Sequence, residues 1–203
     1  MQELIANGVS SFGGGTYESV ALTGVINITS SIASGDMTIE GVGTIHGHVD
    51  AARVGVNGTI KASGSVKSTD FSLHGLGKIA GDLVADRVEV NGSLSVVGMI
   101  NAENIDIKMV NGCSAREVCG GSLTLRKNAS ANILEIITAK RNFQCQSIEC
   151  DDVDIEWANV DSVSGVMVKI GPNCNIGRLE YADGFYADPS SKIREIVKRG
   201  ANS

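Results

Sequence analysis

Two short groups of polar residues have the types and spacing that metal binding or acid–base chemistry requires. His46 and His48 are two positions apart, so on a strand both imidazoles would point to the same side, as in a His-x-His metal site. Asp152, Asp154 and Glu156 alternate in the same way, and paired carboxylates bind calcium or hydrolyse glycosidic bonds. The polar side of a half-buried strand gives the same pattern. We expect that structural role for both groups, with no catalytic residue and no metal site.

Cysteine and glycine give two further chemical signals, and both favour structure over catalysis. The five cysteines are odd in number and none has C-x-x-C spacing, so we expect reduced thiols in the core rather than a zinc site. The runs beginning at Gly41 and Gly75 look like loose dinucleotide-binding loops, but they fall at the same place in a repeat and no helix follows either. We therefore expect no cofactor, no small-molecule substrate and no enzymatic activity.

Composition narrows the class of protein. The chain has 203 residues with a net charge of −6, which disfavours nucleic-acid binding, and no segment is apolar enough for a spanning helix. The first residues lack the basic and apolar regions of a signal peptide, so we expect a cytoplasmic protein. Aromatic residues make up only 4% of the chain, which predicts a narrow interior filled by aliphatic side chains.

An internal repeat of 17 residues organises the sequence from Val20 to Asn104. The fifth position of each repeat is always glycine, and the first, third, ninth and thirteenth positions are apolar. The first position reads Val20, Met37, Val54, Phe71 and Val88, and the glycines are Gly24, Gly41, Gly58, Gly75 and Gly92. Apolar and polar residues alternate within the repeat, which is the period of a strand and not of a helix.

This pattern predicts an all-β fold, a right-handed parallel β-helix in which each repeat forms one triangular coil. The alternation continues less regularly to Tyr181, so we expect about nine coils in a single domain over residues 17–184, after an N-terminal tail over 1–16. One coil buries too little apolar surface to fold alone, so the coils must stack. The two end coils are then exposed sheet edges, which pair with other chains unless they are capped.

The C-terminal segment 185–203 is expected to hold a short helix and a tail. Asp188 and Pro189 suit an N-cap and a first helical position, and Ile193, Ile196 and Val197 would share one helical face. We expect a helix over 189–199 that caps the last coil. Docking on an anionic membrane or on a partner is the alternative role.

The repeats resemble a known family. The run GVGTIHGHVDAARVGVNGTIKASGSVKSTD, followed by LHGLGKIAGDLVADRVEVNGSLSVVG, is similar to the bactofilins, which are bacterial polymer-forming cytoskeletal proteins. The resemblance covers residues 20–121 and weakens towards 181. It implies filaments formed end to end without nucleotide, often at the inner face of the cell membrane, that serve cell shape, motility or the positioning of other proteins.

The resemblance also implies where and with what the chain assembles. The family places its contacts on the end coils, which suggests Val20 and Leu22 at one end and Tyr181, Phe185 and Tyr186 at the other. The expected partners are further copies of this chain, a second bactofilin-like protein and a peripheral membrane surface. Three alternatives stay open: an adaptor that binds or caps a polymer, a carbohydrate-active enzyme, and an acyltransferase, since IGPNCNIG reads like a hexapeptide repeat.

Overall fold

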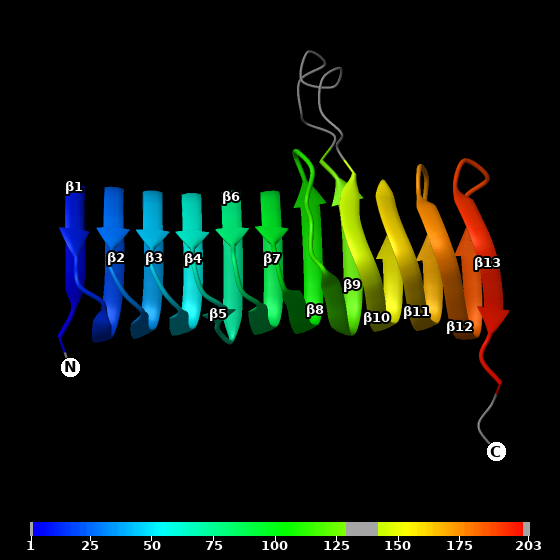
Figure 1. Cartoon of the computed structure of the whole chain (residues 1–203), viewed down its shortest axis with the longest axis horizontal. Coiled ribbons are helices and arrows are strands. Elements are labelled where there is room, and N and C mark those ends of the chain that lie inside the picture. Colours follow the sequence, from blue (N-terminus) through cyan, green and yellow to red (C-terminus); the bar gives the residue numbers. More distant parts are fainter. Residues whose placement is uncertain (1, 129–141, 201–203) are drawn as a thin grey trace, which may run out of the picture.

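The fold is a parallel β-solenoid, seen in a computed structural model that describes residues 2–128 and 142–200. The described residues contain strands and no helix, and every strand pairs in parallel with the strand of the next coil (Figure 1). The strands are β1 (Leu4–Phe12), β2 (Gly15–Ile28), β3 (Ile32–Ile45), β4 (Val49–Ala62), β5 (Val66–Lys67), β6 (Asp70–Ile79), β7 (Leu83–Val96), β8 (Met99–Met109), β9 (Glu117–Lys127), β10 (Phe143–Ile155), β11 (Ala158–Ile170), β12 (Asn175–Ala187) and β13 (Lys192–Lys198). The all-β class and the parallel solenoid agree with the sequence prediction.

Stacked columns of equivalent residues define the coils. One inward column follows the first position of the repeat and runs through eleven coils: Leu4, Val20, Met37, Val54, Phe71, Val88, Ile105, Leu123, Val153, Val168 and Phe185. At about 4.8 Å per coil the stack is roughly 50 Å long. The expectation of nine coils was wrong because the segments that form the first and the last coil were assigned to an N-terminal tail and to a C-terminal helix.

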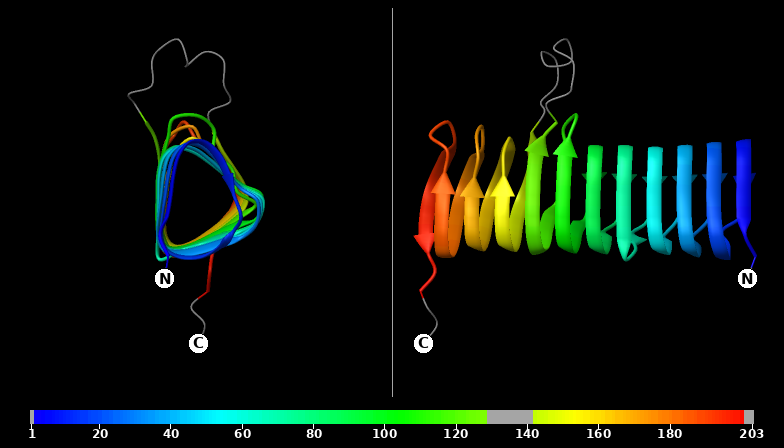
Figure 2. Two further views of the ribbon diagram at one scale, coloured as in Figure 1. Left: turned by 90° about the vertical axis from the view of Figure 1, so that its left-hand side faces the viewer. Right: turned by 180° about the vertical axis from the view of Figure 1, so that it is seen from behind.

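Glycine is required at the fifth position of the repeat because the backbone bends there and neighbouring coils come close. The column Gly24, Gly41, Gly58, Gly75 and Gly92 has positive φ angles throughout. At Gly58, φ is +134°, and a Cβ would stand 2.2 Å from the carbonyl oxygen of Gly41. No other residue fits such a corner, so the glycine column fixes the triangular outline that is visible along the solenoid axis (Figure 2).

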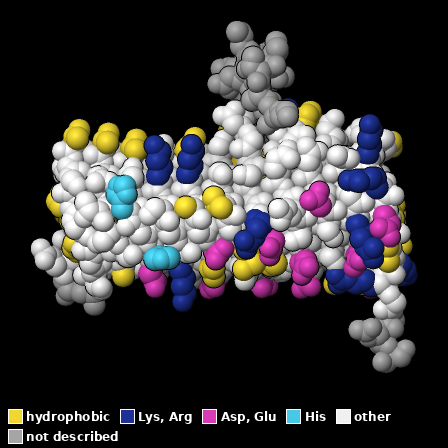
Figure 3. Space-filling view, in the orientation of Figure 1, with side chains coloured by type: hydrophobic (Ala, Val, Ile, Leu, Met, Phe, Trp, Pro, Cys, Tyr) yellow, Lys and Arg dark blue, Asp and Glu magenta, His cyan; other side chains and the backbone are white. Residues whose placement is uncertain are grey.

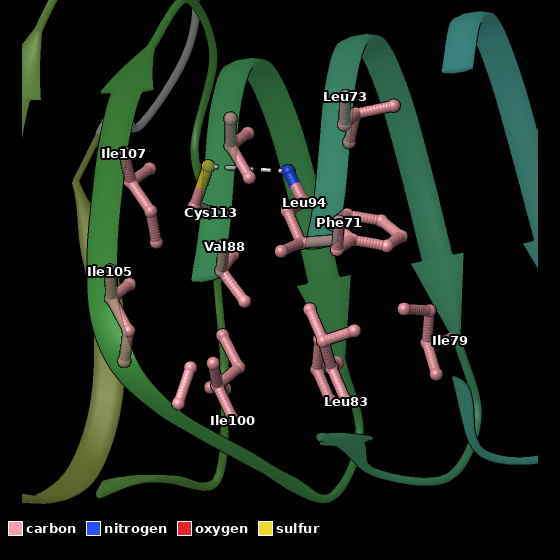
Figure 4. Close-up of a cluster of buried hydrophobic side chains, with 14 of the residues drawn as sticks. Phe71, Leu73, Ile79, Leu83, Val88, Leu94, Ile100, Ile105, Ile107 and Cys113 are labelled. Atoms are coloured by element: carbon pink, nitrogen blue, oxygen red, sulfur yellow. Dashed lines mark hydrogen bonds between the residues drawn. The ribbon is translucent and has the colours of Figure 1, made fainter. Parts of the chain in front are cut away.

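The interior is one continuous aliphatic core. Figure 4 shows the side chains of neighbouring coils interlocking inside the strands, with the Leu94 amide donating a hydrogen bond of 3.2 Å to Sγ of Cys113. One inward column alternates small and large residues, namely Gly43, Ile60, Gly77 and Leu94. A Cβ on Gly77 would lie 2.7 Å from Cδ1 of Leu94. The large residues therefore fill the space that the glycines leave, as close packing requires.

The predicted C-terminal helix over 189–199 was wrong. Pro189 lies in a corner of the solenoid, where the Asp188 carboxylate accepts a hydrogen bond of 2.9 Å from the Ser190 amide. The chain then continues as β13, in which Ile193 pairs with Ile176. Pro172 occupies the equivalent corner of the preceding coil. The spacing of Ile193 and Ile196 suits one face of a helix. It equally suits a strand in which the two residues stack on different inward columns, on Ile176 and Leu179.

The solenoid extends beyond the expected range 17–184 at both ends. Within the expected tail 1–16, β1 forms the first coil, and within 185–203, β12 ends and β13 follows. Met1 and residues 201–203, which belong to the same expected tails, lie outside the described residues. The described parts of these segments are therefore solenoid, with the same parallel pairing as the middle coils.

Candidate functional site

The C-terminal end of the solenoid exposes residues that belong to the core. Phe185 is the last described member of its inward column, and it is 39% exposed because no strand among the described residues stacks on it. Ile196 ends a second inward column and is 47% exposed. The ring of Tyr181 lies 4.7 Å from that of Phe185, measured between centroids. Together Tyr181, Phe185 and Ile196 form an apolar surface, which we call the C-terminal end face.

The backbone at this end is only partly paired. Strand β13 pairs with Asn175–Tyr181 of β12, and among the described residues no strand pairs with the outer edge of Gly184–Ala187. The expected contact Tyr186 lies on this free stretch and is 55% exposed. Because Tyr186 stacks on Lys169 in an outward column, it lies on the lateral surface beside the end face.

Ion pairs hold the last coil together. The Arg178 guanidinium donates to the Glu180 carboxylate at 2.7 Å and to Glu195 of β13 at 3.3 Å, and Arg199 reaches Glu180 at 3.5 Å. The hydrogen bond from Arg178 lowers the pKa of Glu180 below its usual value. These pairs join β12 to β13, so they order the strand that borders the end face.

The N-terminal end is more closed than the sequence suggests. Val20 and Leu22, the expected contacts at this end, are 2% and 1% exposed because Leu4 and Ala6 of β1 stack on them. Val20 and Leu22 therefore lie in the second coil, not at the end. Among the described residues, no strand pairs with the outer edge of β1. The first coil was missed in the sequence because the step from Leu4 to Val20 is shorter than the regular repeat.

His46 and His48 do not form a pair. They flank the corner at Gly47, where β3 has ended, and they bind different partners. Nε2 of His46 lies 2.8 Å from the Asn27 side-chain oxygen, whereas Nδ1 of His48 accepts a hydrogen bond of 3.0 Å from the Ser65 amide. Both imidazoles therefore link adjacent coils.

The alternating carboxylates at the end of β10 are used in hydrogen bonds. Asp154 pairs with Arg126 and, at 3.2 Å, with Lys169. Burial raises the pKa of Asp154, but the hydrogen bonds from the two cations outweigh it and leave the pKa below its usual value. Glu156 accepts a hydrogen bond of 2.7 Å from the Lys127 amide. Among residues 2–128 and 142–200, no group of three or more histidine, cysteine or acidic residues could hold a metal ion.

Four of the five cysteines pack in the core, as expected. All five are free, and four are buried: Cys113, Cys145, Cys150 and Cys174. Burial raises the pKa of the Cys145 and Cys150 thiols to about 12 and that of Cys113 to about 11. Cys119 is half-buried on an outward position. The buried thiols are therefore protonated and unreactive at neutral pH.

One lateral face carries a long groove that was not expected from the sequence. Its walls are two outward columns on either side of a buried column, and it runs from Thr44 to Arg194. Two adjoining sections of the groove share Ser95 and Val97, so it is continuous over about nine coils. In Figure 3 most acidic side chains lie along the lower part of the view, and basic side chains lie both there and at the upper edge. The sequence signal that could have revealed the groove is the spacing of Lys61 and Lys78, which are one repeat apart and therefore lie side by side.

An apolar column borders the N-terminal half of this groove. Val9, Val25 and Val42 follow one another in adjacent coils, and Leu76 continues the column two coils later. Val9 is 86% exposed and Val25 is 52% exposed.

The described part of the chain contains no helix that is long and apolar enough to span a bilayer.

Comparison with known proteins finds similarity over about half of the chain. The chain is 31% identical over 100 residues to the uncharacterized protein YhbF of Bacillus subtilis (strain 168), a match that covers 49% of this chain and 41% of that protein. The matched region therefore spans less than half of the relative's length. No family model matches the chain, and no solved structure matches it.

Proposed function

We propose that this chain is a structural protein of the bactofilin kind, which assembles end to end into filaments without nucleotide. The proposal includes a right-handed β-helix, a cytoplasmic location and peripheral contact with the inner face of the membrane. The sequence resemblance over residues 20–121 supports it, and so does the parallel solenoid. We further propose that the chain is not an enzyme, since Asp154 and Glu156 are engaged in structural hydrogen bonds.

The observation that carries this proposal is the C-terminal end face. Phe185 and Ile196 occupy core columns, yet both are open to solvent. Stacking another coil on them would bury apolar surface at about 25 cal/mol per Å² and pair the free edge of β12. A second copy of the chain offers such a coil at its own end, so repeated stacking produces a filament one solenoid wide.

A non-polymerising adaptor was the main alternative, and its principal support was a capping helix at the C-terminus. The described residues hold the strand β13 in that place, which removes this support for an adaptor. The remaining distinction is experimental, because an adaptor needs a partner polymer and a filament protein does not.

Negative-stain electron microscopy of the purified chain tests the proposal. We expect filaments or sheets about one solenoid wide, formed without nucleotide at both low and high salt. Persistence at high salt is expected because burial of apolar surface drives the stacking, and this term is not screened by ions. Discrete short rods at every protein concentration would instead show that the chain does not assemble alone, and the filament proposal would then fail.

A further inference from the structure

The groove on the lateral face is lined by two ladders of side chains, one residue from each coil. The first ladder consists of polar or basic residues without exception, and its members that line the groove are Thr44, Lys61, Lys78, Ser95, Ser114, Gln144, Asn159 and Asn175. The ladder continues beyond the groove with Ser11 and Asn27 at one end and Lys192 at the other. The second lies across the intervening inward column and includes His46, Ser63, Ala80, Val97, Arg116, Gln146, Asp161, Gly177 and Arg194. The groove floor is the backbone of that inward column.

The charge of the groove is opposite to that of the chain. The two ladders hold five basic residues (Lys61, Lys78, Arg116, Lys192 and Arg194) and a single acidic one, Asp161, whereas the whole chain has 17 basic and 23 acidic residues. The side chain of Arg116 pairs with Glu117 at 3.0 Å. The other four cations make no ion pair within 4 Å among the described residues. The four unpaired cations and Asp161 therefore leave a net charge of +3 along the two ladders of an acidic protein, available for an anionic ligand.

We propose that this groove binds an extended acidic peptide segment of a partner protein. The amide and hydroxyl groups of Ser95, Ser114, Gln144 and Asn159 repeat once per coil and both donate and accept hydrogen bonds, which suits the amide groups of an extended chain. The lysines and arginines would pair with carboxylates. No phenylalanine, tyrosine or tryptophan lines either section of the groove, and single-stranded nucleic acids depend on stacking against such rings, so a peptide fits better.

The positions of the charges define the acidic pattern of the ligand. Lys78 and Arg116 are two coils apart, about 10 Å, and Arg116 and Arg194 are four coils apart, about 19 Å. An extended peptide advances about 3.3 Å per residue, so matching carboxylates would be about three and then about six residues apart. Asp161 lies between Arg116 and Arg194, so the middle of the ligand should be uncharged or basic. The whole groove, about 40 Å long, takes roughly twelve residues.

The test is fluorescence anisotropy with a labelled peptide of about twelve residues, built from Ser, Thr and Gly with three glutamates at that spacing. We expect saturable binding at low salt, weakened about tenfold or more when glutamines replace the glutamates. A peptide of the same composition with its glutamates clustered at one end should also bind more weakly. Equal binding of the spaced and clustered peptides, or no binding of the spaced one, would overturn the proposal.

Two single charge reversals supply the matched comparison. Lys78→Glu removes a groove cation, and Lys67→Glu changes an exposed lysine on another face, next to the column of Asp50. We expect Lys78→Glu to weaken peptide binding several-fold and Lys67→Glu to leave it unchanged. Equal effects of the two variants would show that only overall charge matters, which would refute a groove site. Circular dichroism confirms that both variants fold.

Competition identifies the class of ligand. If single-stranded DNA or heparin displaces the peptide at lower concentrations of charged groups than a second acidic peptide does, the groove recognises a polyanion of another class and the peptide proposal fails. The measurements are made on the wild-type chain and on Phe185→Arg. The groove contains no residue of the end face, so binding by both would separate this inference from the filament proposal.

Discussion

Gly58 lies directly beside Gly41 of the preceding coil, so close that a Cβ on Gly58 would stand 2.2 Å from the Gly41 carbonyl oxygen. This contact makes the glycine corner the most substitution-sensitive part of each repeat. Gly58→Ala adds the steric clash to the strain of a positive φ, which alone costs about 1–3 kcal/mol. We therefore expect the free energy of unfolding to fall by at least that amount, measured by urea denaturation.

Gly55 provides the matched control on the same strand. The nearest atom to a Cβ at this position is 4.0 Å away, and no positive φ is required. Gly55→Ala should leave stability unchanged or raise it by about 0.4–1 kcal/mol through the unfolded state. A similar loss in both variants would mean that the corner geometry is not what demands glycine.

Phe185→Arg should block assembly through the C-terminal end face. The arginine would place a charge where the next coil must stack, and the cost of burying it opposes association. We expect filaments to disappear, with sedimentation reporting monomers if the two different ends join, or dimers if like ends join. The folded coils should persist, because Phe185 is the last member of its column.

Tyr186→Arg is the neighbouring control, since its side chain lies on an outward column. Filaments of normal length are expected from this variant. Loss of assembly in Tyr186→Arg alone would move the contact from the end face to the lateral surface. Leu22→Arg, in contrast, should unfold the first coils and not merely disturb assembly, because Leu22 is buried beneath Ala6.

The buried thiols predict a loss of stability at alkaline pH. Burial raises the pKa of Cys145 to about 12 from 9.0, so above pH 9 the unfolded chain releases a proton that the folded chain keeps. Each such thiol should lower the free energy of unfolding by about 1.4 kcal/mol per pH unit between about pH 9 and 12. Denaturation of the wild type and of Cys145→Ala at pH 8 and 10.5 measures the difference. Identical pH slopes would rule this titration out.

The pairing of Asp154 with Arg126 and Lys169 predicts the opposite pH dependence. The folded pKa of Asp154 is lowered, so its contribution is present above the unfolded value of 3.8 and lost as pH falls through the folded value. Asp154→Asn should cost about 0.5–1 kcal/mol at pH 7, a small value because the side chains are about one-third exposed. This cost should vanish in acid. Asp152→Asn, which removes an exposed carboxylate outside these ion pairs, should have little effect at either pH.

The repeat made the fold predictable, and departures from the repeat concealed its ends. The regular columns identified the parallel solenoid because each column is held by packing of equivalent side chains. The coils of Leu4 and Phe185 were missed, so the count of coils fell short. The step from Leu4 to Val20 is shorter than the repeat, and the chain after Phe185 was assigned to a helix. At Asp188 and Pro189 the local chemistry of a corner imitates a helix start. Whether a helix or a strand follows is decided by stacking on the preceding coil. The residues near Asp188 in the sequence do not contain that information.

The candidate surfaces were predictable to different degrees. Phe185 and Tyr181 were expected at the C-terminal end because the family resemblance implies contacts on the end coils. The groove was not predicted from the sequence. Its cations come from coils of unequal length, so their alignment becomes visible only when the pairing register of all the strands is known. Lys61 and Lys78 reveal one part of it at the regular spacing, whereas Arg116 and Arg194 follow irregular coils.

The alternation of small and large residues along the column of Gly43, Ile60, Gly77 and Leu94 makes neighbouring coils unequal parts. Excising one coil, the segment 54–70, would set Gly43 beside Gly77 and leave an unfilled gap in the interior. Excising two coils, the segment 54–87, would set Gly43 beside Leu94 and restore the match. In this region the interchangeable module is therefore a pair of coils, and the protein can be lengthened or shortened cleanly only in steps of two.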